Sequence, residues 1–463
     1  MNDGDGGFRK LPRSSGCGRD GCSQAAPFFW VRQGRPSCYP QGGRRGEHAP
    51  AGTKYEYHEM GAPMNDFSFY SPTRIVFGKN ALESIGSELG RIGCTKALIV
   101  YGGGSARAAG TLDRVEASLD AAGIAHVELG GVRPNPEITL VREGVELARF
   151  EKVDLIVPVG GGSVMDTAKA IALGAVYDGD VWDFFVHRAA PTERIPVAAV
   201  PTLPASGSEA SNSSVISNDA EHLKCGINTD LNRPVAAFMD PELTYTLPPY
   251  QTAAGAVDII SHVMERFFSG EPAVPVTDHI ACGIIRSVIE CAPRALAQPD
   301  DYDARANLMW AGTLAHNGLA GCGVNVPGSR DGDWTCHGLE HELSALDTSI
   351  THGAGLAVIS PAWMRYVWRE HPERFLTFAR EVFDIEAVDG SDKAIEDAVT
   401  ATIDELQEFF VSLGMPRTLG AFDVHEDDIE RMIPGLTLNR GEVFGSFKQL
   451  TLDDARAIYR SAL

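Results

Sequence analysis

The chain has 463 residues, of which 44% are hydrophobic, enough for two or three domains with buried cores. Its net charge of −22 argues against binding to nucleic acid or to an anionic membrane surface, because both need basic patches. The nine cysteines are scattered without a CxxC pair, and no apolar run reaches eighteen residues. These features favour a cytoplasmic protein that does not enter a membrane.

Residues 1–63 differ from the rest in composition. They hold nine Lys or Arg against six Asp or Glu, are rich in Gly and Pro, and show no helical or strand period. Such a segment cannot bury enough apolar surface to offset chain entropy. We therefore predict a disordered extension that is non-native or wrongly assigned, with Met64 as the natural start. A targeting arm is the alternative.

Short apolar runs alternate with amphipathic stretches from Arg74 to Leu247. Strands are expected over residues 96–100, 126–129, 154–159 and 196–200, and helices over residues 111–122, 136–150 and 164–175. For the second of these helices, Asn135 is the expected N-cap and Pro136 the first helical residue. Strands that alternate with helices predict a parallel, doubly wound sheet.

Beyond Pro248 the strand pattern stops and helix follows helix. Helices are expected over residues 258–268, 276–294, 304–319 and 392–413. The sequence therefore predicts an α/β domain over residues 64–248 and an all-helical domain over residues 249–463.

Two glycine-rich turns follow strands of the α/β half, GGGS at 102–105 and GGGS at 160–163. Such turns let backbone N–H groups approach a phosphate, although many are simply tight turns. The first turn carries no acidic residue to repel a 2′-phosphate, and Arg107 follows it, which favours NADP over NAD. Arg107 could instead lie on a solvated helix face.

Histidine and aspartate residues recur at helical spacing in the second half. Asp258 and His262 are four residues apart, as are His337 and His341, and His352 follows. One Asp with several His suits Zn²⁺ or Fe²⁺, and a vacant position would polarise an alcohol or carbonyl oxygen. Taken singly, each of these residues could be an ordinary helix side chain.

The order of motifs resembles that of the iron-containing alcohol dehydrogenase family, in its butanol-dehydrogenase-like branch of NADPH-dependent aldehyde reductases. The motifs are PNP at 134–136, GGGSVMD at 160–166, TLPASGSE at 202–209, DP at 240–241, Asp258-x-x-x-His262 and HGLEHEL at 337–343. The resemblance covers residues 64–463.

That resemblance implies the dehydroquinate-synthase-like fold, with a Rossmann-like N-terminal domain and a helical C-terminal domain. It implies one divalent metal, Fe²⁺ or Zn²⁺, on Asp258, His262, His337 and His352, with His341 close to the reacting centre. For the cofactor NADP(H), the implied residues are Gly102, Gly103 and Ser105 near the 2′-phosphate, Asn135 near the adenosine, Gly161, Gly162, Ser163 and Asp166 at the pyrophosphate and ribose, and Thr202, Leu203, Ser206, Ser208 and Lys224 beside the nicotinamide half.

Three features depart from the family pattern. The segment from His337 to His352 is one residue longer, which makes His352 the weakest of the ligand assignments. Ser211 stands where many relatives have Asn, with Asn212 beside it. The stretch 321–333 is also longer and could reshape the substrate entrance.

The expected function is hydride transfer between NADP(H) and a primary alcohol or aldehyde, in a homodimer. A lyase of the dehydroquinate synthase type is one alternative. It would need a basic pocket, and Lys224 is one basic residue, but the helical half shows no obvious Lys/Arg cluster near the candidate ligands. A non-catalytic homologue is the other alternative, although no ligand or glycine turn is lost.

Overall fold

The computed structural model describes residues 63–221, 223–270, 273–325 and 332–463. The chain divides into two units, Met1–His58 and Glu59–Leu463, and every described residue belongs to the second. The prediction made for residues 1–63 therefore falls outside the described residues except at Pro63. The same holds for residues 326–331 of the long stretch at 321–333.

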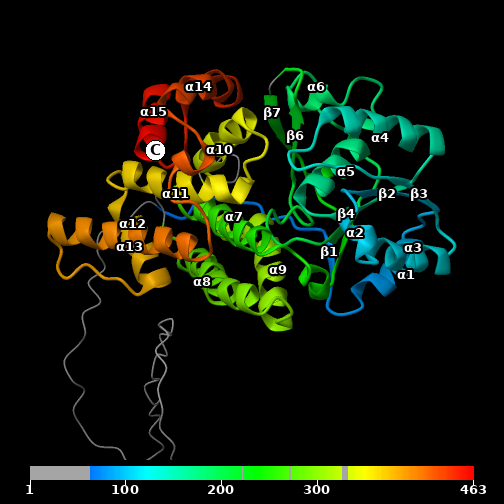
Figure 1. The fold of residues 1–463 in the computed structure, drawn as a ribbon, viewed down its shortest axis with the longest axis horizontal. Helices are drawn as coiled ribbons and strands as arrows, with labels where there is room; N and C mark the ends of the chain where they lie inside the picture. Colours follow the sequence, from blue (N-terminus) through cyan, green and yellow to red (C-terminus); the bar gives the residue numbers. More distant parts are fainter. Residues whose placement is uncertain (1–62, 222, 271–272, 326–331) are drawn as a thin grey trace, which may run out of the picture. The chain divides into compact units, whose positions relative to one another are not determined.

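A six-stranded parallel sheet forms the framework of the first half, in the order β1-β8-β5-β4-β2-β3 (Figure 1). Its strands are β1 (Arg74–Phe77), β2 (Lys96–Tyr101), β3 (Ala125–Leu129), β4 (Leu155–Gly160), β5 (Ala198–Pro201) and β8 (Ala236–Met239). All four predicted strands occur, and the parallel sheet is confirmed. The strands β1 and β8 were not among the predicted ranges.

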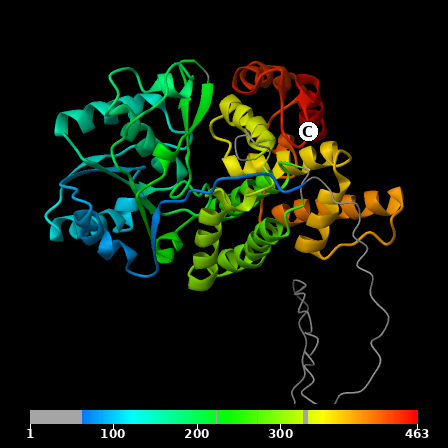
Figure 2. The ribbon, with the colours of Figure 1, turned by 180° about the vertical axis from the view of Figure 1, so that it is seen from behind.

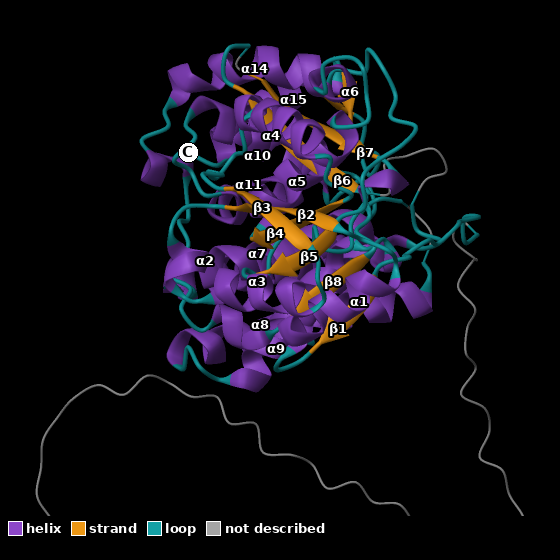
Figure 3. Ribbon diagram, turned by 90° about the vertical axis from the view of Figure 1, so that its right-hand side faces the viewer, coloured by secondary structure: helices purple, strands orange, loops and turns teal. Residues whose placement is uncertain are grey.

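Helices cover both faces of this sheet (Figure 3). They are α1 (Ile85–Arg91), α2 (Ser105–Ala108), α3 (Thr111–Ala121), α4 (Ile138–Glu151), α5 (Gly162–Gly174) and α6 (Trp182–Phe185). Alternate residues of β2 face opposite sides, as the strand period requires. Leu98 and Val100 pack with α4 and α5, whereas Ala97 and Ile99 pack with α1 and α3. Both faces are buried, which explains why the strands read as continuous apolar runs.

The predicted start of one helix in this half was wrong. α4 begins at Ile138, not Pro136, and its N-cap is Glu137, not Asn135, which has a φ of 55° in the left-handed region. The Asn135 side chain instead donates to the Thr348 carbonyl of the helical half, 3.1 Å away. In addition, the sequence pattern did not reveal the antiparallel hairpin β6 (Ser213–Asn218) and β7 (Leu223–Asn228).

The second half is a bundle of helices that begins with α7 directly after Pro248 (Figure 1). The helices are α7 (Pro249–Phe267), α8 (Pro275–Ala297), α9 (Tyr302–His316), α10 (Thr335–Leu346), α11 (His352–Val367), α12 (Pro372–Phe383), α13 (Asp392–Ser412), α14 (Glu426–Arg440) and α15 (Leu452–Ser461). The expectation of helices alone was wrong in one detail, since β9 (Val443–Phe444) and β10 (Leu450–Thr451) form a short antiparallel pair. None of the described helices meets the length and apolarity needed to span a bilayer.

The segment before β1 links the two halves from behind (Figure 2). Asn65 is tied to the helical half, because its backbone N–H donates to the Gly323 carbonyl and its side chain donates to the carbonyls of Val324 and Asn325. The chain then reaches the outer edge strand of the sheet. Asn65 therefore anchors this segment to the helical half.

Candidate metal and cofactor site

A cleft of about 1280 Å³ lies where the α/β half faces the helical half. One wall of the cleft is formed by the turns that follow β2, β4 and β5. These turns lie at the carboxyl ends of the strands, where doubly wound sheets bind ligands. Helices α7, α10 and α11 supply the opposite side. Every residue that the sequence marked as a site residue lines this cleft, apart from Gly103.

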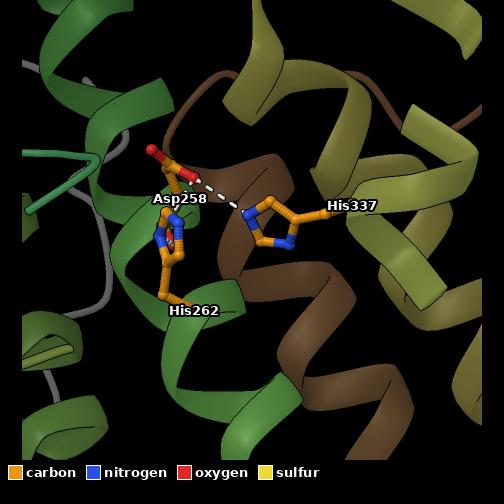
Figure 4. A group of neighbouring side chains, drawn as sticks. All are labelled: Asp258, His262 and His337. Atoms are coloured by element: carbon orange, nitrogen blue, oxygen red, sulfur yellow. Dashed lines mark hydrogen bonds and ion pairs between the residues drawn. The ribbon is translucent and has the colours of Figure 1, made fainter. Parts of the chain in front are cut away.

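Three helices bring the candidate metal ligands together, and Figure 4 shows those that come from α7 and α10, namely Asp258, His262 and His337. Asp258 and His262 lie one turn apart on α7, and Nδ1 of His262 is 3.2 Å from the Asp258 carboxylate. Nε2 of His337, from α10, and Nε2 of His352, the first residue of α11, each lie 3.7 Å from the same oxygen, Oδ1 of Asp258. Ligand atoms of Asp258, His262 and His337 all lie within 4.8 Å of one another.

Two of these atoms are buried without a hydrogen-bond partner, Oδ1 of Asp258 and Nε2 of His337. Leaving such atoms unpaired is costly, and native interiors rarely tolerate it. A divalent cation would satisfy both, and a carboxylate oxygen with imidazole nitrogens is a donor set suited to Zn²⁺ or Fe²⁺. The residues therefore fit a metal ion.

Two buried glutamates form hydrogen bonds with the rings of His337 and His352. Oε2 of Glu265 lies 2.5 Å from Nδ1 of His337, and its Oε1 accepts from the backbone N–H groups of Cys336 and His337. Glu340 bonds Nδ1 of His352 in the same way. Carboxylates on Nδ1 fix the tautomer that leaves Nε2 free for a metal. The sequence analysis missed both, although Glu265 follows Asp258 by seven residues and so shares its helix face.

Electrostatics at this cluster favour a charged aspartate. Burial opposes ionisation of Asp258, but the neighbouring His262, His337 and His352 outweigh it and hold its pKa well below the usual range. Burial dominates at His262 and lowers its pKa to about 3. At His337 burial acts in the same direction, but Glu265 and Asp258 prevail and raise the pKa to about 9.

His341 lies beside the cluster and also lines the cleft. Its ring centroid is 6.4 Å from that of His337 and 5.6 Å from that of His352. Glu340, His341 and His352 also have ligand atoms within 4.8 Å of one another. Burial, aided by the charge of Lys224, holds the pKa of His341 well below its usual value, so the ring is neutral near pH 7.

The second glycine turn meets the loop after β5 at close range. Gly161 is the N-cap of α5, and a Cβ on Gly162 would lie 2.6 Å from the Ser206 hydroxyl. Asp166, one turn into α5, accepts from the Ser208 hydroxyl and from the Val215 backbone N–H. The turn, the loop and the hairpin are thus held as one wall of the cleft.

A buried lysine forms further hydrogen bonds within this wall. The sequence analysis did not single it out. Nζ of Lys169 donates to the hydroxyls of Ser208 and Ser211 and to the carbonyls of Ser211 and Ser213. Burial lowers its pKa to about 8. The Ser211 hydroxyl and carbonyl are therefore engaged in hydrogen bonds within the protein.

The first glycine turn is more open. Gly102 and Ser105 line the cleft, and a Cβ on Gly103 would meet no atom within 4 Å. Arg107 is not free on its helix face, because it pairs with Glu128, Glu116 and Asp113.

The sequence showed no obvious Lys/Arg cluster near the candidate ligands in the helical half, but the structure places two arginines of that half at the cleft. Arg266 and Arg440 line the cleft together with Lys224. Arg266 follows His262 by one helical turn, donates to its carbonyl oxygen and lies over the Trp334 ring, 4.6 Å from its centroid.

Comparison with known proteins agrees with this architecture. The family model described as iron-containing alcohol dehydrogenase matches residues 72–241, and that described as Fe-containing alcohol dehydrogenase family, C-terminal, matches residues 252–463. NADH-dependent butanol dehydrogenase A of Clostridium acetobutylicum is 40% identical over 400 residues, covering 86% of this chain and 100% of the relative. NADPH-dependent aldehyde reductase YqhD of Escherichia coli is 36% identical over 406 residues, with the same coverage of both chains.

Among solved structures, NADH-dependent butanol dehydrogenase A of Thermotoga maritima superposes with a TM-score of 0.81 at 38% identity, covering 86% of this chain and 99% of that one. The expected dehydroquinate-synthase-like fold is confirmed, as is the expected function in its broad form, a metal-dependent oxidoreductase of alcohols and aldehydes. The chain belongs to the iron-containing alcohol dehydrogenase family.

Proposed function

We propose that the enzyme interconverts small primary alcohols and aldehydes with NADP(H) and one divalent metal ion. The observation that carries the proposal is the convergence of two unpaired buried atoms, Oδ1 of Asp258 and Nε2 of His337, in the cleft that both glycine turns reach. The names of the relatives, butanol dehydrogenase and aldehyde reductase, favour short aldehydes such as butanal. NADPH oxidation with a series of aldehydes, in the presence and absence of chelator, tests the proposal.

In this proposal Asp258, His262, His337 and His352 hold the metal, which is Fe²⁺ or Zn²⁺. A bound metal would supply Lewis acidity to the substrate oxygen. Asp258 contributes the negative charge, while Glu265 and Glu340 hold the rings of His337 and His352 with Nε2 toward the ion. Metal analysis of protein purified without added metal distinguishes iron from zinc.

The cofactor lies along the other wall of the cleft. Gly161, Gly162, Ser163 and Asp166 hold its pyrophosphate and ribose, because the N-terminus of α5 offers backbone N–H groups and a favourable dipole. Thr202, Leu203, Ser206, Ser208 and Lys224 flank the nicotinamide half, and Asn135 lies on the adenosine side. NADP(H) supplies the hydride chemistry, and the protein supplies position and electrostatics. NADPH donates a hydride, and an aldehyde that accepts it becomes the alcohol, so aldehyde reduction is the proposed direction.

The choice of NADP(H) over NAD(H) is assigned to the turn formed by Gly102, Gly103 and Ser105, which has no carboxylate to repel a 2′-phosphate. The charge of Arg107 is already offset by its three acidic partners, so the discrimination rests on the turn itself.

Gly103→Asp tests this assignment, since its side chain has open space. Like charges ~4 Å apart repel by roughly 4 kcal/mol at an effective dielectric near 20, and even about 1.4 kcal/mol costs tenfold in affinity. The kcat/KM ratio of NADPH to NADH should therefore fall in Gly103→Asp and stay near wild type in Gly103→Asn. A wild type that prefers NADH would contradict the assignment.

His341 is the proposed proton relay between substrate and solvent. It lines the cleft, its ring centroid lies 5.6 Å from that of His352, and imidazole can pass a proton through its two nitrogens. The neutral ring that burial enforces can accept a proton at one nitrogen while it donates at the other.

The organisation of the chain follows the same reasoning. We assign residues 64–248 to NADP binding, residues 249–463 to metal binding, and no role in catalysis to residues 1–63. Cys94, Cys225, Cys282, Cys291 and Cys336 are free thiols, which supports the proposed cytoplasmic location.

A homodimer is proposed through the open edge of the sheet. Within the described part of the chain, the outer strand β1 pairs only with β8, and exposed aromatic residues lie on and before it, at Phe67, Phe69, Tyr70 and Phe77. Unpaired strand edges and apolar surface favour association. Sedimentation analysis of wild type and of Phe69→Ser with Tyr70→Ser tests this surface, and an unchanged dimer in the variant would exclude it.

A further inference from the structure

His316, the last residue of α9, lies between the two walls of the cleft without a role in the scheme above. Its Nδ1 is 2.6 Å from the carbonyl oxygen of Ser206, in the loop assigned to the nicotinamide half. Its ring centroid is 4.2 Å from that of His262 and 5.5 Å from that of Trp334. The imidazole therefore bridges the cofactor loop and the metal-binding helix, where the reacting carbon must lie.

The hydrogen bond to Ser206 fixes which nitrogen carries the proton. A carbonyl oxygen can only accept, so Nδ1 donates and bears the hydrogen. In the neutral ring Nε2 then presents a lone pair.

This lone pair is available to a ligand. Among the described residues, Nε2 of His316 has no hydrogen-bond partner. It is not a fully buried atom, and His316 lines the cleft, so a bound molecule can reach it. The neighbouring indole of Trp334 can donate a hydrogen bond but cannot accept one, so it does not compete with Nε2 of His316 for the donor group of a ligand. A hydroxyl group of a bound molecule is a suitable donor.

We infer that Nε2 of His316 accepts a hydrogen bond from a second hydroxyl of the substrate, on the carbon next to the reacting one. This inference rests on the proposed function, in which the reacting oxygen is directed toward Asp258, His262 and His337. His316 lies beside that group and is not part of it, so it serves a neighbouring hydroxyl. The substrate class favoured is therefore vicinal diols with a primary alcohol, and the corresponding 2-hydroxy aldehydes.

Two substitutions separate this role from the contact with Ser206. In His316→Asn, the side-chain amide can still donate to the Ser206 carbonyl, but no acceptor remains at the position of Nε2. In His316→Gln, the longer amide places an oxygen near the position of Nε2. Propane-1,2-diol and propan-1-ol form the matched substrate pair, since they differ by a single hydroxyl and both are oxidised at the terminal carbon.

The measured quantity is the ratio of kcat/KM for propane-1,2-diol to that for propan-1-ol with NADP⁺. A hydrogen bond of ordinary strength changes this ratio by about two- to tenfold. We expect the ratio to fall by that factor in His316→Asn and to recover at least in part in His316→Gln. Bound metal and the Kd for NADPH should stay near wild type in His316→Asn.

The outcomes are distinct. If the ratio in His316→Asn equals that of wild type, or falls equally in His316→Gln, the acceptor role is wrong. If His316→Gln alone weakens NADPH binding while the ratio is constant, the residue merely anchors the loop. If wild type turns over neither alcohols nor aldehydes, the proposed function itself fails, which the propan-1-ol arm and an NADPH oxidation assay with propanal reveal independently.

Discussion

Glu265→Gln should weaken metal binding although Glu265 is not a candidate ligand. The carboxylate is 2% exposed and accepts three hydrogen bonds, from Nδ1 of His337 and from the backbone N–H groups of Cys336 and His337. Glutamine has the same shape but only one acceptor oxygen. In either orientation of the amide, its N–H group meets a donor.

The size of the effect follows from what the change does to His337. If the amide N–H faces Nδ1, the imidazole moves its proton to Nε2 and the nitrogen aimed at Asp258 can no longer bind metal. Losing a carboxylate that orients a ligand histidine typically costs 10- to 100-fold in metal affinity, about 1.4–2.8 kcal/mol. If the amide turns around, a backbone donor is left unpaired at a cost of about 1–3 kcal/mol in stability.

Competition with a chromophoric chelator measures the metal Kd, and thermal unfolding of the metal-free protein measures stability. Glu209→Gln is the matched control, because Glu209 is also buried but bonds Thr313 instead of a histidine. Both variants should lose some stability, and only Glu265→Gln should lose metal affinity. Equal metal affinity in wild type and Glu265→Gln would refute the orienting role.

Three further outcomes are expected. His341→Ala should keep its metal but turn over about 10²–10⁴-fold more slowly, as judged by metal analysis and steady-state kinetics; loss of metal would make His341 a ligand in place of His352. Removing residues 1–63 should leave kcat and Tm nearly unchanged, and a large fall in either would show that this segment packs on the body. Because the pKa of His337 is raised from 6.5 to about 9, its protonation stabilises the metal-free fold fully below pH 6.5, and this contribution is lost as the pH rises through 9. Melting curves in chelator should therefore show Tm falling over this interval, while metal titrations show rising affinity as the competing proton is lost; a flat pH profile of both would contradict the shift.

Strong local signals made much of the fold predictable from sequence. The strands β2 and β4 are unbroken apolar runs because both of their faces are buried, and α7 begins after Pro248 because proline suits the first turn of a helix. The hairpin of β6 and β7 carries no such signal. Its residues include two buried serines, Ser214 and Ser217, and burial of the Ser214 hydroxyl is tolerated because it donates to the Asp166 carbonyl of α5.

Most residues that line the cleft at the candidate site could be picked out from the sequence, but the contacts between them could not. Asp258 and His262 are marked by helical spacing, yet their convergence with His337 depends on how three helices pack. A local capping rule predicted Asn135 as the N-cap of α4. The structure differs because the Asn135 side chain donates to the Thr348 carbonyl across the cleft. His316 carries no motif, and only the fold brings it against Ser206 and His262.

The most direct test of the central claim compares wild type with Asp258→Ala. In each protein, bound metal, NADPH affinity and NADPH oxidation with butanal are measured on the same preparation. Wild type should hold one divalent metal per chain and reduce butanal. Asp258→Ala should hold none and be inactive while it binds NADPH as wild type does, because the residues proposed to bind the cofactor lie on the opposite wall of the cleft. An Asp258→Ala protein that keeps its metal or its activity would contradict the account.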